Sequence, residues 1–428
     1  MTTSNQTLKE AYVWIWLPEK TTPIVAGKLS LHEELYSFNY GKRYLERNNA
    51  IALYDRELPL QRGVILPERG LIMPNCIRDA SPDAWGRRVI LNRHYGQKST
   101  QLDTSELNEL NYLLESGSDR IGSLDFQYSG TEYIPRCSVN AHLDELLESA
   151  ARVEQGIPLT VELDQALFHG SSIGGARPKA FIEYKHKKYI AKFSSSSDIY
   201  SLLKLEFIAM RLARLVGLKV ASVNLVQAAH KDILLIERFD RISTNTGWQR
   251  RGMLSALTLL GLDEMMARYA SYEKLAEIIR YRFDNPSETL KELFSRLVFN
   301  ILVSNTDDHA RNHAAFWDGQ HLTLTPVYDV CPQNRTGSTA SQAMLITGQD
   351  RRSQLTTCLL AAYHFLLSEE EAMEIIKHQI DGIRVHWDEV CSLAKLSEVE
   401  KNFFWGKQFL NPYVFFEFPG SASILNPD

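Results

Sequence analysis

The sequence lacks the features that mark secreted, zinc-binding and membrane-spanning proteins. Its five cysteines are scattered, and they form neither a Cys-x-x-Cys pair nor a Cys/His cluster, which argues against a disulfide framework and a structural zinc site. No apolar run approaches the roughly 18 residues that a membrane helix needs. The start, MTTSNQTLKEAYVWIWLP, lacks the basic-then-apolar order of a signal peptide. These absences predict a protein of the reducing cytoplasm that has no membrane partner.

The chain also lacks an excess of positive charge. It has 47 Lys and Arg against 52 Asp and Glu, a net charge of −5 at pH 7, which argues against a free-standing nucleic-acid binder but not against a local basic patch. Internal repeats and long low-complexity tracts are missing too. What remains is 428 residues of ordinary globular composition, 44% hydrophobic and 23% charged, enough for two to three domains.

Hydrophobic patterning predicts an α+β fold with a first part (1–160), a strand-rich lobe (161–252) and a helical lobe (253–428). In the first part, YVWIWL (12–17) is typical of a buried strand. DASPDAWGRRVILNRHYG (79–96) predicts a helix with Ser81 as N-cap and Pro82 at its first position.

The pattern changes near residue 160. KAFIEYKHKKYIAKF (179–193) alternates around a polar KHKK turn and predicts a hairpin, followed by a helix over 199–217 and two strands within 220–239. Farther on, a long helix is expected behind Asn285, and a strand pair around the Asp-Gly turn at 318–319. A sheet lobe beside a helical lobe predicts a ligand site in the cleft between them.

The octet NTDDHARN (305–312) crowds polar side chains directly after the apolar LFSRLVFNILVS. Asp307 and Asn312 have four residues between them, the spacing of the catalytic Asp and the metal-binding Asn in protein kinases. A second metal-binding Asp should follow a short strand pair, and Asp329 in TPVYD has that place. Oxygen ligands such as Asn312 and Asp329 suit magnesium.

The strand-rich lobe has candidates for the other half of a kinase site. GSSIGGARPK (170–179) is a Gly-containing loop before the hairpin, where Gly174 and Gly175 would cover ATP phosphates. Lys192 ends the second strand of the hairpin, the place of a phosphate-pairing lysine, and Glu206 on the next helix is its expected partner. IERFDR (236–241) has the position of an adenine-binding hinge.

In that hinge, main-chain groups of Glu237 and Phe239 would face the base, and Asp240 would reach the ribose.

Each element of the predicted site also has a plainer structural interpretation. A Gly-Gly pair is commonly a turn, Lys192 and Glu206 are commonly surface residues, and Asp329 can be a turn former. Asp308 and Arg311 are expected to be solvated loop residues or substrate contacts, and His309 a hydrogen bonder that braces the loop.

With these motifs the chain resembles HipA-type serine/threonine kinases, the toxins of bacterial toxin–antitoxin pairs. The resemblance runs from about residue 12 to 400. It rests on SPDAWGR (81–87), SIGGARPK (172–179), ERFDR (237–241), NTDDHARN (305–312) and TPVYD (325–329). Two features depart from the family pattern: the loop reads Ala-Arg-Pro-Lys at 176–179, and an acidic pair after ERFDR is not evident.

The resemblance implies a kinase-like fold with two lobes, and roles for individual residues. Asp307 would be the catalytic Asp, Asn312 and Asp329 would hold Mg2+, and Lys192 would hold ATP phosphates; His309 would belong to the loop motif. Ser172, or the adjacent Ser171, would be autophosphorylated, which ejects the loop and inactivates the kinase. A dianion beside the nucleotide phosphates would repel them, although loop hydrogen bonding is the alternative for both serines.

The resemblance also implies partners. The protein substrate would be a translation component such as an aminoacyl-tRNA synthetase. The cognate partner would be a small helix-turn-helix antitoxin, similar to HipB, through which DNA contact would mainly occur. Two other functions stay open: a small-molecule kinase of related fold, which would share Asp307, Asn312 and Asp329, and an antitoxin-binding co-repressor without kinase activity, which would require a lost catalytic residue.

Overall fold

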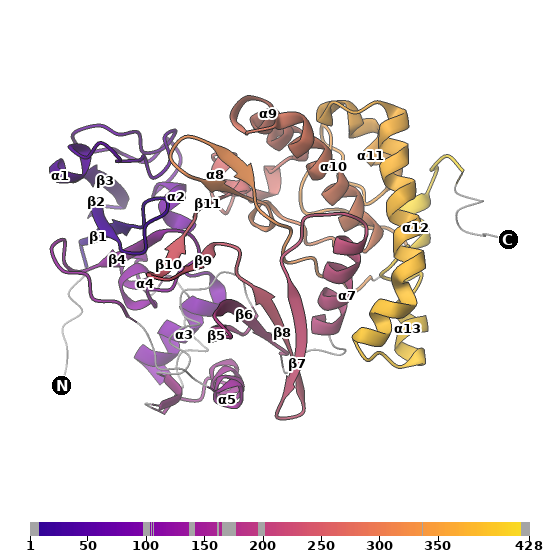
Figure 1. Ribbon diagram of the computed structural model, residues 1–428, viewed down its shortest axis with the longest axis horizontal. Coiled ribbons are helices and arrows are strands. Elements are labelled where there is room, and N and C mark those ends of the chain that lie inside the picture. The colour runs from indigo at the N-terminus through magenta and orange to yellow at the C-terminus, as the bar shows by residue number, and fades with distance from the viewer. Residues whose placement is uncertain are drawn as a thin grey trace. The chain divides into compact units, whose positions relative to one another are not determined.

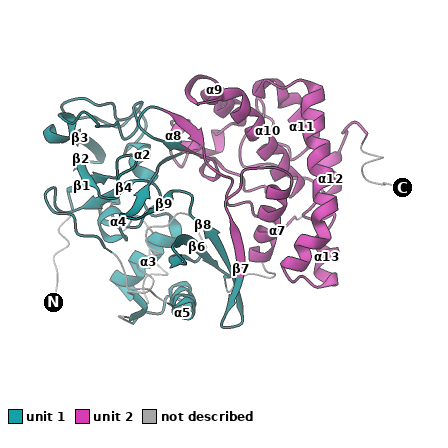
Figure 2. Ribbon diagram, viewed as in Figure 1, with its two compact units in different colours: residues 1–199, 226–254, 316–320 teal, residues 200–225, 255–315, 321–428 magenta. Residues whose placement is uncertain are grey.

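The computed structural model describes residues 8–96, 103, 105, 107–136, 142–160, 162–164, 177–195, 202–335 and 337–420 (Figure 1). The chain divides into two compact units, each assembled from separate chain segments (Figure 2). Unit 1 comprises residues 1–199, 226–254 and 316–320, and unit 2 comprises residues 200–225, 255–315 and 321–428. Unit 1 thus holds most of the two regions that we predicted as separate, 1–160 and 161–252.

The first sheet of unit 1 has four antiparallel strands in the order β3-β2-β1-β4. Its strands are β1 (Glu10–Ile15), β2 (Ile24–His32), β3 (Leu35–Tyr40) and β4 (Leu124–Gln127). The predicted strand at 12–17 is therefore present as β1, shifted by two residues. Three short helices belong to the same region: α1 (Lys42–Leu45), α2 (Asn75–Arg78) and α4 (Glu109–Glu115).

The second sheet has the order β5-β6-β8-β7. Its strands are β5 (Lys179–Tyr184), β6 (Lys187–Phe193), β7 (Val223–Ala228) and β8 (Lys231–Glu237). The β5–β6 connection is the two-residue turn Lys185-His186, with φ of 49° and 58°. Positive φ at both positions matches the twist of the flanking strands, so the predicted hairpin is confirmed with KHKK at its tip.

Two helices, α3 (Ala84–Tyr95) and α5 (Leu143–Glu154), pack against this second sheet. Along β6, Tyr189, Ala191 and Phe193 belong to the buried core that these helices share with the sheet. Because side chains alternate along a strand, Lys192 belongs to the other face of the sheet. The core consists of Trp85, Val89, Leu146, Leu147, Ala150, Val153, Ala180, Tyr189, Ala191, Phe193, Ile233 and Leu235.

The predicted start of the helix at 79–96 is wrong. Helix α3 begins at Ala84 behind Asp83, which makes no side-chain cap. Ser81 is buried instead, and its hydroxyl donates to Glu109 Oε2 at 3.1 Å. A distant carboxylate therefore uses the hydroxyl that the local pattern assigned to a cap.

The remaining strands are short. β9 (Arg241–Thr244) and β10 (Gly247–Arg250) form an antiparallel hairpin. A three-stranded sheet has the order β11-β12-β13, from β11 (Gly252–Ser255), β12 (Ala314–Trp317) and β13 (Leu322–Leu324). The strand pair predicted around the Asp-Gly turn is confirmed, since β12 and β13 flank Gly319, whose φ is 102°.

Unit 2 is mainly helical. Helix α10 is at its centre and contacts α9, α11 and α12. Asn285 before it has left-handed φ (51°) and Pro286 is its first residue, where the missing N–H costs nothing, which confirms the predicted start. The helices are α7 (Leu202–Leu215), α8 (Ala256–Leu259), α9 (Tyr272–Arg282), α10 (Pro286–Leu302), α11 (Leu355–Ala361), α12 (Glu369–Leu393) and α13 (Glu398–Phe404). Among the described residues of both units, no helix is long and apolar enough to span a bilayer.

Candidate active site

The loop 305–312 follows α10 and is tied to it at its start. Ser304 adopts a left-handed conformation (φ 52°) that turns the chain out of the helix. Asn305 donates from its main-chain N to Asn300 O at 2.8 Å and from Nδ2 to Asn300 Oδ1 at 3.0 Å. The carbonyl of Thr306 accepts from Ala343 N at 3.0 Å. These bonds fix the residues that lead into Asp307.

Asp308 lies inside unit 2, so our expectation of a solvated residue or a substrate contact is wrong. Its side chain is 2% exposed. Its Oδ1 lies 2.9 Å from His313 Nε2, and its Oδ2 accepts the hydroxyl of Tyr272. Burial, and then the charge of Asp308, raise the pKa of Tyr272 well above its ordinary value, so Tyr272 is the donor. Asp308 is therefore an internal anchor of the loop.

Asp307 has the opposite environment and is accessible to solvent. Partial burial of the carboxyl raises the pKa of Asp307; His309 opposes that rise, whereas Asp329 and Asp308 add to it. The carboxylates of Asp307 and Asp329 are thus close enough to repel one another. An accessible carboxylate with a raised pKa has the property that a general base needs.

Asn312 and Asp329 carry the donor atoms expected of a magnesium site. Asn312 Nδ2 donates to Asp307 O at 3.2 Å, which leaves the amide oxygen as the atom that can bind a metal. Asp329 has a left-handed φ of 60°, a conformation that costs a non-glycine residue energy and is often found at functional sites. Two neighbouring carboxylates and an amide oxygen suit a hard divalent cation whose remaining ligands are phosphates and water.

The described residues contain no group of three or more His, Cys, Asp and Glu side chains that could hold a metal by themselves. The donor set of Asn312 and Asp329 therefore fits Mg2+ that is shared with a bound nucleotide. It does not fit a cage built by the protein alone.

Among the described residues, the Nδ1 atom of His309 does not make the side-chain bond that we expected to brace the loop. Its Nδ1 is buried and has no hydrogen-bond partner among the described residues. Its carbonyl makes the bracing contact instead, accepting from Asn312 N at 2.8 Å. Arg311, which we expected to be a solvated loop residue or a substrate contact, is partly buried and pairs with Glu264 at 2.7 Å.

A small cavity within unit 2 is lined by both polar and apolar residues, some of them from the loop 305–312. Asn305, Asp308, Asn312, His313 and Tyr328 are among its lining residues. Within the described part of the chain, the buried Oδ1 of Asn305 and Nδ1 of His313 lack hydrogen-bond partners. An ordered water in this cavity would satisfy such atoms.

In unit 1, Lys192 lies on β6 with Lys179 of β5 as its register partner. Both lysines are nearly buried, at 7% and 6% exposure. Directly opposed residues of antiparallel strands have their side chains on one face, and two like charges there repel each other. Two lysines on one face of the sheet supply the kind of charge that holds the phosphates of a nucleotide. Lys179 is thus a second candidate for phosphate binding, which the sequence analysis did not identify.

Two further predictions are not tested by the geometry: the Lys192–Glu206 pair and the roles of the Gly-containing loop. Glu206 is buried on α7 of unit 2, at 3% exposure, whereas Lys192 belongs to unit 1, so their pairing stays a prediction. The loop residues Ser171, Ser172, Gly174 and Gly175 lie outside the described residues. Phosphate covering by the two glycines and autophosphorylation of either serine therefore stay predictions.

The hinge segment, which we define as residues 237–239, begins at the last residue of β8 in unit 1. Glu237 pairs with Lys187 at 2.9 Å, and the ring of Phe239 is 5.9 Å from that of Phe316 in an edge-to-face arrangement. Their contact with adenine stays a prediction. Asp240 is 2% exposed, and both its oxygens accept bonds from arginine side chains. This favours a structural role over the ribose contact that we expected.

Comparison with solved structures identifies the fold. A structure titled "Shewanella oneidensis MR-1 Toxin Antitoxin System HipA, HipB and its operator DNA complex" matches with a TM-score of 0.69 and 18% identity. The match covers 97% of this chain and 99% of that one. The predicted fold class, a kinase-like α+β fold with a strand-rich and a helical lobe, is thereby confirmed.

The sequence comparisons identify the family. The HipA-like C-terminal domain matches residues 171–387, half of the chain, and the HipA N-terminal domain matches residues 15–127. The chain belongs to the HipA family, as the resemblance predicted.

Two curated relatives match over part of their length. The serine/threonine-protein kinase toxin HipA of Shewanella oneidensis is 27% identical over 188 residues, which are 37% of this chain and 42% of that protein. A relative from Haemophilus influenzae is 28% identical over 181 residues, 37% of this chain and 52% of that protein. The matches thus span about half, or less, of these relatives.

Proposed function

We propose that this protein is an ATP- and Mg2+-dependent serine/threonine-protein kinase that acts as a toxin. One observation carries the proposal: within unit 2, the accessible Asp307 has a pKa raised in part by Asp329, while Asn312 is bonded to the carbonyl of Asp307. These three residue types, in this order, are those of the kinase catalytic loop and its second metal ligand. The name of the Shewanella relative supports the same class of reaction.

In the proposed reaction, Asp307 accepts the proton of a substrate serine or threonine hydroxyl and orients its oxygen toward the γ-phosphate of ATP. The bond from Ala343 to the carbonyl of Thr306 holds the main chain before Asp307, and the buried Asp308 and the bond from Asn312 hold it after Asp307, so that little reorganisation accompanies the transfer. Asn312 and Asp329 would hold Mg2+, and the bound ion would supply positive charge that offsets the negative charge of the reacting phosphates. Lys192 of unit 1, together with Lys179, would hold the phosphates.

The substrate and the partner belong to the proposal as well. A translation component such as an aminoacyl-tRNA synthetase would be phosphorylated, and autophosphorylation of Ser172 or Ser171 would switch the kinase off. The solved structure with the same fold is a complex of HipA, HipB and operator DNA. A helix-turn-helix antitoxin of that kind would bind this chain and make the main contact with DNA.

Incubation of the purified protein with Mg2+ and γ-labelled ATP tests the proposal. We expect label on Ser171 or Ser172 in the wild type, and none in Asp307→Ala. The matched control is Asp388→Ala, which removes an exposed carboxylate from α12 of the same unit and should label like the wild type. Equal labelling of all three proteins would contradict the role of Asp307. A wild type that takes up no label and carries no phosphate as purified would contradict autophosphorylation.

Two other functions predict different results. A small-molecule kinase would use Asp307 and Asp329 but consume ATP only with a soluble hydroxyl compound, and its expression would not arrest growth. A co-repressor without kinase activity would bind the antitoxin and leave ATP unchanged. We expect growth arrest on expression of the wild type, relief by the co-expressed antitoxin, and no arrest with Asp307→Ala.

A further inference from the structure

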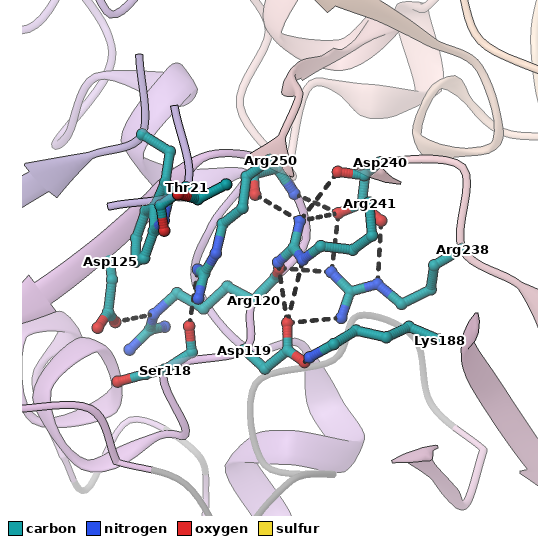
Figure 3. Close-up of polar contacts among 12 residues, drawn as sticks. Thr21, Ser118, Asp119, Arg120, Asp125, Lys188, Arg238, Asp240, Arg241 and Arg250 are labelled. Carbon is teal, nitrogen blue, oxygen red and sulfur yellow. Dashed lines mark hydrogen bonds and ion pairs between the residues drawn. The ribbon is translucent and has the colours of Figure 1, made fainter. Parts of the chain in front are cut away.

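The segment after β8 is held inside unit 1 by a cluster of four charged residues, Asp119, Arg238, Asp240 and Arg241, which we call the arginine cluster (Figure 3). Arg238 Nη1 and Arg241 Nη2 each lie 2.9 Å from Asp119 Oδ1. Arg238 Nη2 and Arg241 Nη1 lie 2.8 Å and 2.7 Å from Asp240 Oδ2. Each carboxylate therefore bonds to both guanidinium groups, and the cluster closes into a ring.

The arginine cluster joins two distant parts of the chain. Asp119 lies before β4 in the first sheet region, whereas the other three residues follow β8 of the second sheet. The carbonyl of Arg120 accepts from Arg238 Nη2 at 2.7 Å, and Gly122 N donates to Asp240 Oδ2 at 2.9 Å. The segment 119–122 thus contacts both Arg238 and Asp240 through side chains and main chain.

The cluster is buried, so its charges depend on one another. The side chains are 0–1% exposed for the two arginines, 3% for Asp240 and 9% for Asp119. Burial alone would raise the pKa of Asp119, but Arg238, Arg241 and Lys188 hold the pKa well below its ordinary value. Removing one partner of such a group leaves an uncompensated buried charge, so the geometry around Asp119 is strongly fixed.

The buried residues alternate with the residues of the hinge segment that we expect to face adenine. Arg238 and Asp240 are buried, whereas Glu237 and Phe239 are only partly buried. The main chain is bonded on both sides of Phe239, from Arg238 N to Lys188 O at 2.8 Å and from Arg251 N to Asp240 O at 3.0 Å. Holding the side chains of 238 and 240 therefore sets the direction of the main-chain groups at 237 and 239.

We propose that Asp119 is a positioning residue for nucleotide binding, which fixes the hinge segment through Arg238 and Arg241. The inference rests on the proposed function, because it assigns the hinge segment to a nucleotide. It goes beyond that function by placing a determinant of ATP affinity in the N-terminal part of the chain, 119 residues before Arg238. Asp119 itself does not contact the nucleotide in this proposal.

Asp125 provides the matched control for Asp119. Its carboxylate is also buried, at 0% exposure, and also pairs with two arginines, Arg120 and Arg136, each at 2.9 Å. Its other partners include Ser118, Tyr133 and Gln127, which lie outside the hinge segment. Asp119→Asn and Asp125→Asn each remove one buried charge from unit 1, but of the two carboxylates only Asp119 bonds directly to Arg238 and Arg241.

The experiment measures two quantities on the full-length protein and both variants: KM and kcat with ATP, and hydrogen exchange of the peptide that covers residues 236–241. For Asp119→Asn we expect a KM for ATP raised about tenfold with kcat changed less than about twofold, and faster exchange of the peptide. For Asp125→Asn we expect lower stability without either change. Lys188→Gln is the milder second variant, since Lys188 Nζ lies 2.6 Å from the other oxygen of Asp119. It should raise the KM about two- to threefold if Asp119→Asn fails to fold.

The outcomes separate this inference from the proposed function. If both Asp variants alter exchange and KM equally, or if neither Asp119→Asn nor Lys188→Gln alters them, Asp119 only stabilises the unit and the inference is overturned. If the wild type binds no ATP but Asp119→Asn alone accelerates exchange at 236–241, the proposed function fails and takes the nucleotide part of the inference with it. The structural coupling of Asp119 to the hinge segment would then stand by itself.

Discussion

His313 Nε2 lies 2.9 Å from Asp308 Oδ1. His313 directly follows Asn312, and Asp308 directly follows Asp307, so this one contact joins the two ends of the loop that present the base and the metal ligand. The hydroxyl of Tyr272 completes the group by donating to Asp308. Burial of all three side chains makes the contact costly to break.

Tyr272→Phe removes the hydroxyl and leaves Asp308 with one donor fewer. We expect the free energy of unfolding to fall by about 1–3 kcal/mol, the cost of an unsatisfied buried acceptor. Tyr281→Phe on the same helix is the control, because that ring is 78% exposed and its change should be near zero. Denaturant unfolding of both variants measures the difference. Equal values for the two tyrosines would show that Asp308 does not depend on Tyr272.

Asp329→Asn tests the second proposed metal ligand. A neutral amide binds Mg2+ more weakly than a carboxylate, so we expect the Mg2+ concentration for half-maximal ATP use to rise at least about tenfold. Asp388→Asn, an exposed site in unit 2, should keep the wild-type value. The measurement is a Mg2+ titration of ATP turnover at fixed ATP. An unchanged titration curve for Asp329→Asn would place the metal ligand elsewhere.

Asp240 makes stability depend on pH in the acid range. Burial alone would raise the pKa of Asp240, but Arg238 and Arg241 hold the pKa at about 2. A carboxylate with a lowered pKa stabilises the fold above the unfolded value of about 3.9, and that stabilisation is lost as the pH falls toward 2.

Asp240→Asn should therefore cost about 3–5 kcal/mol at pH 7, because two buried arginines lose a partner. The difference from the wild type should shrink as the pH falls from about 4 to about 2, where the wild-type carboxylate becomes protonated. Urea unfolding at several pH values measures this. A difference that stays constant over this range would mean that Asp240 titrates normally.

Gly319→Ala tests the close approach of two segments within unit 1. A Cβ at Gly319 would lie 2.5 Å from Ile51 Cγ2, and the φ of 102° is unfavourable for alanine. We expect a loss of about 2–4 kcal/mol from overlap and backbone strain together. Gly337→Ala, at φ of 92° with open space around its Cβ, should show the strain alone. In an Ile51→Ala background, Gly319→Ala should cost less, and an unchanged cost would exclude the steric explanation.

The sequence predicted the elements whose signals are local. The β5–β6 hairpin, the start of α10 behind Asn285 and the strand pair around Gly319 each depend on a few adjacent residues with strong turn or helix-start preferences. The kinase spacing of Asp307 and Asn312 is equally local, and the family matches now cover it. These are the features that single-sequence patterns record.

The features that the sequence did not reveal all depend on distant partners. Ser81 is not a helix cap because its hydroxyl bonds to Glu109. Asp308 is buried because Tyr272 and His313 are hydrogen-bond partners of its carboxylate. Asp119 and Arg238 are 119 positions apart, and neither has a local pattern that marks it. A charged residue in a polar octet predicts exposure, and only the folded chain shows which charge has buried partners.

The division of the chain into interleaved segments has a consequence for its synthesis. Trp317 donates to the carbonyl of Ala52 at 2.9 Å, and its ring packs against Tyr54, so a late segment completes the core of the earliest unit. A ribosome delivers residues in order, and domains that are continuous in sequence can fold before translation ends. Here the part of unit 1 in the first 199 residues cannot reach its complete fold until residue 320 has been synthesised. For this protein the acquisition of a complete unit 1 is deferred until about three quarters of the polypeptide has been made.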